Sequence, residues 1–266
     1  MPLQVILAGA TGWAGSALAR AVAHSDDLAL VAGVSRRHAG RTLGEVLDIP
    51  GLTAPLYASA AEALATPCDV FVEYTQPEVA RANVTGALLL GAHVVIGTSG
   101  LTGEDLAALD GLAREHHVGV LAVGNFSLAS LVLAKAAELA ARVMPQFEII
   151  DYASATKPDA PSGTARELAN RLARIRVPEP PVPIALTQGA VETRGATLDG
   201  IQVHSIRLPG HVIAVEALFG MQDEKVSLRY DAGSSAEPLV AGALLAIRKV
   251  GGLVGLHRGL DSVMEF

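Results

Sequence analysis

The start of the chain limits the choice of fold most strongly, because an apolar run, a glycine-spaced turn and a helical pattern follow one another there. Leu3 to Leu7 is apolar, Gly9 to Gly15 carries a glycine at every third position, and the helical pattern covers Ser16 to His24. In such a turn the first glycine allows a tight bend, the second lets a pyrophosphate approach the backbone, and the third lets helix and strand pack closely. We therefore predict a dinucleotide-binding turn with these contact residues: Gly9, Thr11, Gly12, Trp13 and Ala14.

A second apolar run, Leu28 to Val34, ends in Ser35, Arg36 and Arg37. Folds of this type that prefer NAD usually place an acidic side chain here, where it binds the ribose 2′-hydroxyl. A serine and two arginines suit a 2′-phosphate better, because a guanidinium group binds phosphate oxygens in a bidentate fork. The sequence thus favours NADPH, with NADH as the second choice. The alternative is that both arginines are solvated loop charges.

Strand and helix patterns then alternate up to Val123, which is typical of a parallel sheet covered on both faces. The predicted strands are Asp69 to Glu73, His93 to Ile96 and Val118 to Val123, and the predicted helices are Pro77 to Leu90 and Thr102 to His116. Doubly wound sheets bind ligands at the carboxyl ends of their strands. The candidate coenzyme contacts at these ends are Tyr74, Thr75, Gly97, Thr98, Ser99, Asn125 and Phe126. Ordinary turns have a similar composition, so that alternative stays open.

The pattern changes after Ser127, where a helix is expected to about Met144 and is followed mainly by strands. These strands are Phe147 to Tyr152, Gln202 to Arg207, Val212 to Phe219 and Lys225 to Tyr230, with a hairpin turn expected at Leu208-Pro209-Gly210. Val177 to Gly200 reads as irregular, and Glu237 to Val250 as a helix that returns to the first domain. We therefore expect a Rossmann-type α/β domain over residues 1–124 and 236–266. Residues 125–235 should form a second, α+β domain on a mixed open sheet.

The segment from Lys157 to Thr164 is the strongest candidate for chemistry in the second domain. It combines a lysine, two prolines and a Ser-Gly-Thr sequence that opens a helical pattern from Ala165 to Arg174. Backbone N–H groups at a helix start have no intrahelical partner and carry partial positive charge, so they bind anions. We predict that Ser162, Gly163 and Thr164 bind an anionic group beside Lys157. This segment, Lys157 to Thr164, is called the clamp below.

Composition excludes several other classes of protein. The net charge of −7 argues against a nucleic-acid-binding surface, which is usually basic. The apolar runs are interrupted by charges, which argues against a membrane span. One cysteine excludes an intrachain disulfide, and no basic segment precedes the first strand, so a reducing cytoplasm is expected. No spacing of His, Cys, Asp or Glu suggests a metal site.

These motifs resemble those of the dihydrodipicolinate reductases of lysine biosynthesis, over essentially the whole chain. The most specific is Lys157-Pro158-Asp159-Ala160-Pro161-Ser162-Gly163-Thr164, and His204 to Gly210 supports it. The resemblance implies a homo-oligomer, a tetramer or a dimer, that reduces a cyclic unsaturated imine dicarboxylate with NADH or NADPH. It also implies that Lys157 is the catalytic lysine beside the reacting ring. The carboxylate of the substrate would bind Gly163 and Thr164, with Ser162, Ser154 and His204 as further contacts.

One departure from the family pattern concerns the proton that the reduced product needs. The family carries two histidines in the strand before the clamp, one of them taken as the proton donor, but this chain has Ala153 and Ser154 at those positions. Lys157, Tyr152 and His204 are the candidate replacements, although strand alternation places Tyr152 and Ala153 on opposite faces. Three functions therefore stay open: a reductase of the family's substrate, a reductase of another cyclic imine or unsaturated carboxylate, and a non-catalytic nucleotide-binding protein.

Overall fold

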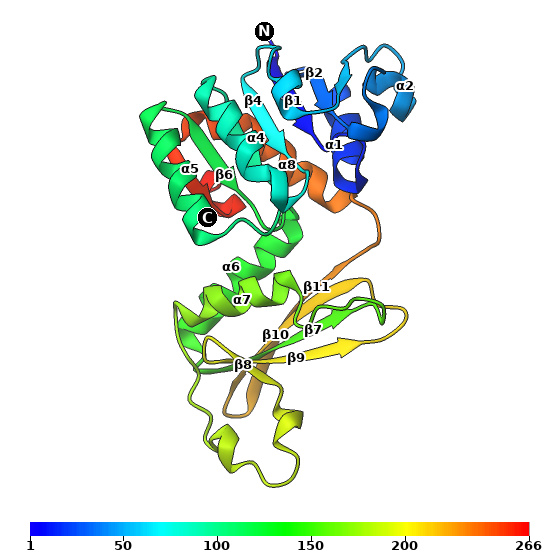
Figure 1. Cartoon of the computed structure of the whole chain (residues 1–266). Coiled ribbons are helices and arrows are strands. Elements are labelled where there is room, and N and C mark those ends of the chain that lie inside the picture. The colour runs from blue at the N-terminus through cyan, green and yellow to red at the C-terminus, as the bar shows by residue number, and fades with distance from the viewer. Residues whose placement is uncertain (266) are drawn as a thin grey trace. The chain divides into compact units, whose positions relative to one another are not determined.

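A computed structural model describes residues 1–265, and the chain divides into two compact units (Figure 1). The first unit contains Met1–Leu128 and the chain from Ala236 onward, and the second contains Ala129–Ser235. The predicted domain boundaries lie at 124/125 and at 235/236. The first unit is called the nucleotide unit below and the second the clamp unit.

The nucleotide unit is built on a seven-stranded sheet in which every pair of neighbouring strands is parallel. Its strands are β1 (Leu3–Ala8), β2 (Leu28–Val34), β3 (Leu56–Tyr57), β4 (Val70–Glu73), β5 (His93–Ile96), β6 (Gly119–Ala122) and β12 (Gly255–Arg258). The order β12-β6-β5-β4-β1-β2-β3 reverses direction between β1 and β4, as in doubly wound dinucleotide folds. The predicted Rossmann-type fold is confirmed.

Helices cover both faces of this sheet, which explains why its strands are almost continuously apolar. The helices are α1 (Trp13–Ala23), α2 (Leu43–Leu47), α3 (Ala60–Ala63), α4 (Pro77–Leu89), α5 (Gly103–Glu115) and α8 (Glu237–Lys249). Helix α1 packs against α8, and α4 packs against α3 and α5. The sequence did not predict α2, α3, β3 or β12, because each is too short to show a periodic pattern.

The clamp unit contains the predicted mixed sheet, with helices on one of its faces (Figure 1). Its elements are α6 (Leu128–Val143), β7 (Gln146–Ala153), α7 (Gly163–Ala173), β8 (Ala196–Leu198), β9 (Ile201–Arg207), β10 (Ile213–Met221) and β11 (Glu224–Ala232). Apolar side chains of α6 and α7 form a core with β7, β9 and β10. Strand β7 alternates regularly, and its buried residues are Phe147, Ile149, Asp151 and Ala153.

The predicted hairpin at Leu208-Pro209-Gly210 is wrong. The strand order is β11-β10-β7-β9-β8, so β7 lies between the two strands that this turn connects. Strand β7 runs parallel to β9 and antiparallel to β10, and the connection passes over the end of β7. Local sequence shows a turn here, but not that a strand from earlier in the chain occupies the central position. Within 177–200, predicted as irregular, the structure adds the three-residue strand β8.

Within residues 1–265, no helix is both long enough and apolar enough to cross a bilayer.

Candidate active site

The glycine turn lies between β1 and α1 and has the expected geometry. Gly9 has a φ of +79°, and a Cβ there would lie 2.3 Å from the carbonyl oxygen of Tyr74. A Cβ at Gly15 would lie 2.1 Å from the carbonyl oxygen of Gly9, so helix and strand approach too closely for a side chain. Gly12 is the N-cap residue of α1 and supplies no side-chain cap. The helix start therefore keeps the uncapped form that suits phosphate oxygens.

A cavity of about 600 Å³ opens beside this turn. It brings together Gly9, Thr11, Gly12, Ser35 and Arg36 with the loop after β4, including Tyr74 and Thr75. The hydroxyl groups of Thr11 and Ser35 are 2.7 Å apart and hydrogen-bonded. Arg36 lines the cavity, whereas Arg37 is exposed and is not among its lining residues. Trp13 is 61% exposed at the start of α1.

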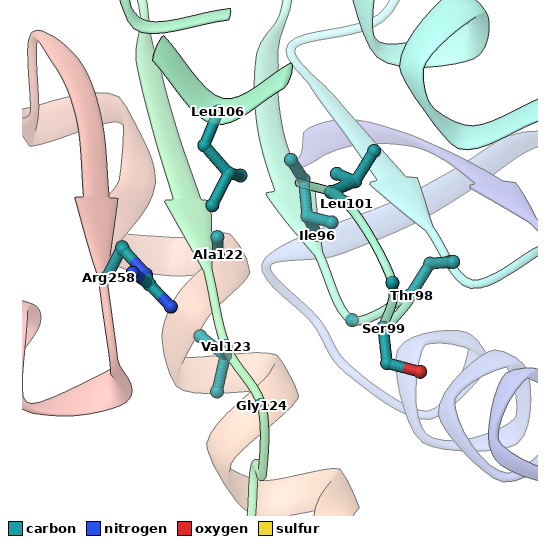
Figure 2. A pocket seen from close by; sticks show the side chains of 11 residues that line it. Ile96, Thr98, Ser99, Leu101, Leu106, Ala122, Val123, Gly124 and Arg258 are labelled. Carbon is teal, nitrogen blue, oxygen red and sulfur yellow. The ribbon is translucent and has the colours of Figure 1, made fainter. Parts of the chain in front are cut away.

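A second, smaller cavity of about 140 Å³ lies at the ends of β5 and β6 (Figure 2). Gly97, Thr98 and Ser99 line it, together with Gly124 and Arg258, which extends from β12 in Figure 2. Sequence reasoning missed Arg258, because β12 was not predicted. In a doubly wound fold a dinucleotide spans the point where the strand order reverses. The large cavity therefore suits the adenosine half of a dinucleotide, and the small cavity suits the other half.

Tyr74 and Phe126 form an aromatic pair between the loops after β4 and β6. Their ring centroids are 5.6 Å apart, and the backbone of Gly97 lies against both rings. Burial raises the pKa of the Tyr74 phenol well above its ordinary value, so this hydroxyl stays neutral. The side chain of Asn125 accepts a hydrogen bond from the Ser127 amide at 2.9 Å, which shapes the loop before α6.

Glu73, the last residue of β4, was also missed. Its side chain is fully buried, and its carboxylate accepts hydrogen bonds from Thr75, Thr98 and Asn83. Thr75 and Thr98 belong to the two loops predicted to bind the coenzyme. A glutamate at a strand end could have drawn attention by its charge in an apolar run, but its partners are up to 25 residues away in the chain.

In the clamp unit the predicted clamp forms the loop before α7 and the first turn of that helix. Ser162 is the N-cap residue, and its buried hydroxyl accepts a hydrogen bond from the Ala165 amide at 3.3 Å. Among the described residues, the amides of Gly163 and Thr164 have no hydrogen-bond partner, and Gly163 is exposed. Two N–H groups thus point out of the helix start, as an anion site requires. The Ser162 side chain instead holds the helix start in shape.

Lys157 is not a free cation in this structure. Its ammonium nitrogen lies 2.8 Å from a carboxylate oxygen of Asp159, and Arg166 lies 3.8 Å from the other oxygen. The hydrogen bond from Lys157 lowers the pKa of the Asp159 carboxyl group. Asp159 therefore stays ionised at neutral pH and holds Lys157 in place. An incoming carboxylate would meet two cations that share one aspartate.

A buried ion pair lies beneath the clamp. Asp151 is fully buried, and one of its oxygens accepts hydrogen bonds from Arg207 at 2.7 Å and from the Ser162 amide at 2.9 Å. Arg207 also donates to the carbonyl oxygen of Asp159 at 2.8 Å. Burial opposes the ionisation of Asp151, but the hydrogen bonds from Ser162 and Arg207 outweigh it, and the pKa of its carboxyl group is lowered. The pair thus fastens the clamp to the ends of β7 and β9.

No acidic side chain replaces the family's histidines at their own positions. Ala153 is fully buried, and the Ser154 hydroxyl is hydrogen-bonded to that of Thr156 at 3.0 Å. Tyr152 lies on the opposite face from Ala153, as strand alternation predicted, and donates to Glu216 at 2.9 Å. Burial and this glutamate raise the pKa of Tyr152, which makes it a weaker acid.

His204 does not reach the clamp. It is paired with Ile150 in the sheet register, whereas Asp151 and the clamp belong to the other face. Its imidazole lies 2.7 Å from Glu148, which also binds Arg194. His204 therefore belongs to a charged cluster with Glu148 and Arg194 on the face away from the clamp.

Comparison with known proteins agrees with this geometry. Residues 3–126 match the family description "Dihydrodipicolinate reductase, N-terminus", and residues 129–263 match "Dihydrodipicolinate reductase, C-terminus". The 4-hydroxy-tetrahydrodipicolinate reductase of Moorella thermoacetica is 37% identical over 99% of this chain and 98% of its own. The same enzyme of Geobacillus kaustophilus is 33% identical over the full length of both chains.

Solved structures give the same result. A dipicolinate-bound dihydrodipicolinate reductase from Paenisporosarcina sp. TG-14 superposes with a TM-score of 0.85, at 29% identity, over 99% of this chain and 100% of its own. An amine dehydrogenase from Mycobacterium smegmatis, at 12% identity and a TM-score of 0.69, shares the fold alone. The geometry and the comparisons lead to one conclusion. The nucleotide unit has a glycine turn and two strand-end cavities, the clamp lies on a separate sheet, and family models match both halves of the chain. The chain belongs to the dihydrodipicolinate reductase family of NAD(P)H-dependent oxidoreductases.

Proposed function

We propose that the chain reduces 4-hydroxy-tetrahydrodipicolinate, the substrate in its relatives' names, and so acts in lysine biosynthesis in the cytoplasm. The observation that carries this proposal is the clamp. Two unpaired amides at the start of α7 stand on a helix that a buried ion pair holds in position, with Lys157 in the same loop. A cyclic dicarboxylate supplies the anionic group that this arrangement binds. The pyridine nucleotide, when bound, supplies the hydride.

The coenzyme contacts follow from the two cavities of the nucleotide unit. The glycine turn would hold the pyrophosphate, and the large cavity the adenosine half. The loop at Gly97 to Ser99 lines the small cavity together with Gly124, and it would border the nicotinamide half with the adjacent Asn125. NADPH is the favoured coenzyme, because the large cavity has a guanidinium group at Arg36 and the Ser35 hydroxyl, while its acidic lining residue, Glu78, belongs to α4. A 2′-phosphate gains from that cation.

Lys157 is the proposed proton donor. Hydride addition to an imine carbon leaves the nitrogen in need of a proton, and positioned acids contribute about 10²–10⁴-fold to such steps. Lys157 carries its proton as an ammonium group held by Asp159. Ala153 cannot donate, Ser154 is hydrogen-bonded within its own turn, and Tyr152 faces away. Lys157 is therefore the acid of the clamp loop.

A homo-oligomer, a tetramer or a dimer, is also proposed. In the described part of the clamp unit, α6 and α7 cover one face of the sheet. The other face carries Tyr152, Glu216 and Arg229, and Arg229 lies 4.6 Å from the Tyr152 ring centroid. A second copy of this face would cover it. Sedimentation of the purified protein measures the assembly directly, and a monomer at micromolar concentration would refute the proposal.

The function is tested by following NADPH oxidation while the substrate is generated by the preceding enzyme of the pathway. Rescue of a lysine auxotroph that lacks the reductase is the companion test. We expect turnover and rescue. Dipicolinate, which is bound in the related Paenisporosarcina reductase, is a stable probe of the clamp, and calorimetry should show that it binds. Folded protein with neither turnover nor rescue would contradict the proposal.

A second candidate is reduction of another cyclic imine or an unsaturated carboxylate. The observation that favours it is Ala153, which is fully buried where the family has a histidine. A substrate that is already an iminium ion needs less proton assistance. Ala153→His separates the two candidates: a gain in reduction of the family substrate indicates that only the acid was missing. No gain in a folded variant favours the different substrate.

A further inference from the structure

Glu73 is a buried carboxylate whose partners are all neutral donors. Its side chain has no solvent exposure, and among residues 1–265 the donors to its carboxylate are the neutral groups of Thr75, Asn83 and Thr98. One carboxylate oxygen accepts from the Thr75 amide at 2.7 Å, from the Thr75 hydroxyl and from the Thr98 hydroxyl at 3.2 Å. The other accepts from the Asn83 side-chain amide at 2.9 Å. Burying a charge is costly unless hydrogen-bond donors surround it. The carboxylate of Glu73 therefore needs these donors to stay in place around it.

The partners of Glu73 belong to three separate segments. Thr75 lies in the loop after β4, Thr98 in the loop after β5, and Asn83 on α4. The backbone adds to this connection, because the Glu73 carbonyl accepts from the amides of Gly97 at 3.0 Å and Thr98 at 3.2 Å. Glu73 therefore connects the loop after β4, the loop after β5 and α4 through hydrogen bonds.

The same partners line the two cavities of the nucleotide unit. Thr75 and Asn83 line the large cavity, and Gly97 and Thr98 line the small one. A ligand that spans both cavities requires the two loops in one fixed arrangement. A ligand confined to the side of the large cavity formed by Ser35 and Arg36 does not.

We propose that Glu73 is a positioning residue. Its carboxylate aligns the loops after β4 and β5 so that both halves of the coenzyme can bind at the same time. This inference rests on the proposed coenzyme function. Glutamine at position 73 has nearly the same shape but only one acceptor oxygen. Its NH₂ group would face either the Thr75 amide or the Asn83 amide, so a buried donor would be left facing another donor.

The test compares Glu73→Gln with wild type by calorimetry, using two probes. NADPH would span both cavities, whereas adenosine 2′,5′-bisphosphate lacks the nicotinamide half. We expect NADPH affinity to fall about tenfold, which corresponds to about 1.4 kcal/mol, and kcat to fall, while the affinity for the bisphosphate is unchanged. Equal affinity of both proteins for NADPH, or an equal loss for both probes, would overturn the proposal.

Asp110→Asn is the matched control. Asp110 is a carboxylate of the same unit that binds the Leu256 amide at 2.7 Å and Arg114 at 2.9 Å, and so ties β12 to α5. Its substitution should lower the melting temperature without changing the ratio of the two affinities. If Asp110→Asn changes that ratio as Glu73→Gln does, the ratio reports stability alone and the proposal fails.

Thr98→Val provides a second route if Glu73→Gln does not fold. It removes one donor and should weaken NADPH binding but not bisphosphate binding; unchanged NADPH binding refutes the proposal. Where both variants fold, the double variant should lose less NADPH affinity than the sum of the two single losses, because the residues share one hydrogen bond. Additive losses would contradict it. Wild-type protein that binds neither NADPH nor NADH would refute the proposed function instead.

Discussion

Each unit contains a fully buried carboxylate on a sheet strand, and the two are stabilised differently. Glu73, at the end of β4 in the nucleotide unit, accepts hydrogen bonds from neutral donors. Asp151, in β7 of the clamp unit, is paired with Arg207. Both fasten a loop that carries candidate site residues. In the clamp unit the loop is held by an ion pair. In the nucleotide unit it is held by hydrogen bonds from neutral side chains and backbone amides.

The difference predicts different consequences of mutation. Removing one member of a buried ion pair leaves an uncompensated charge, which is strongly destabilising. Removing one acceptor oxygen that binds neutral donors costs less stability. Its main effect should be a change in the position of the loops that carry those donors. Substitutions in the buried ion pair of the clamp unit should therefore mainly lower stability. Substitutions around Glu73 should mainly weaken coenzyme binding. The exception in the clamp unit is Lys157, which is partly exposed and should act on chemistry alone.

Lys157→Ala should have the largest effect. Turnover should fall about 10²–10⁴-fold, the contribution of a positioned acid, while NADPH still binds, because the coenzyme residues belong to the other unit. Steady-state kinetics measures turnover. Quenching of the fluorescence of Trp13, the single tryptophan, measures NADPH binding. Lys225→Ala, an exposed lysine on β11, is the control and should retain activity. Turnover that survives Lys157→Ala would remove the central catalytic assignment.

Arg207→Met tests the buried pair directly. It leaves Asp151 charged and unpaired, so the free energy of unfolding should fall by about 3–5 kcal/mol in denaturant titration. Arg248→Met is the contrasting control, because Arg248 forms an exposed pair with Asp27 at 2.7 Å. That change should cost little stability, because exposed ion pairs contribute little. Equal losses in the two variants would mean that burial does not distinguish these pairs.

Arg36→Ala tests whether the guanidinium group in the large cavity binds the 2′-phosphate of NADPH. NADPH affinity should fall about tenfold, or about 1.4 kcal/mol, and NADH affinity should change little, because NADH lacks the 2′-phosphate. Arg37→Ala should have a smaller effect, since Arg37 does not line the cavity. Calorimetry with both coenzymes gives the four affinities. A larger effect of Arg37 on NADPH would reverse the assignment of the two arginines.

Acid should weaken the same buried pair, because it protonates Asp151. The pKa of its carboxyl group is lower in the folded chain than its ordinary value of 3.8, so the unfolded state binds the proton first as pH falls. The stabilisation from ionised Asp151 is thus complete above that ordinary value and is lost as pH falls through the lower folded value. Urea unfolding of wild type and Asp151→Asn should give curves that converge below about pH 4. Parallel curves down to the lowest pH would contradict this.

The sequence predicted much of the architecture because periodicity is local information. The parallel sheet, the long helices and the alternation of Tyr152 and Ala153 on β7 are confirmed. The pairing of β9 with β10 was wrong, because a turn signal does not reveal that β7 lies between them. The short elements β3, β8 and β12 lack enough residues to show a pattern, and Arg258 was missed with β12.

The contacts that organise each candidate site were decided by tertiary structure. Glycine spacing and the sequence of the clamp identified where an anion could bind, because backbone geometry at a helix start depends on neighbouring residues. Glu73 and Asp151 gave no comparable signal, since Thr98 is 25 residues from Glu73 and Arg207 is 56 from Asp151. Local sequence therefore determined the fold class and the segments that we predict to bind anions. Only the packed sheets decided which buried carboxylate holds which loop, because burial and hydrogen bonding depend on residues that folding brings together.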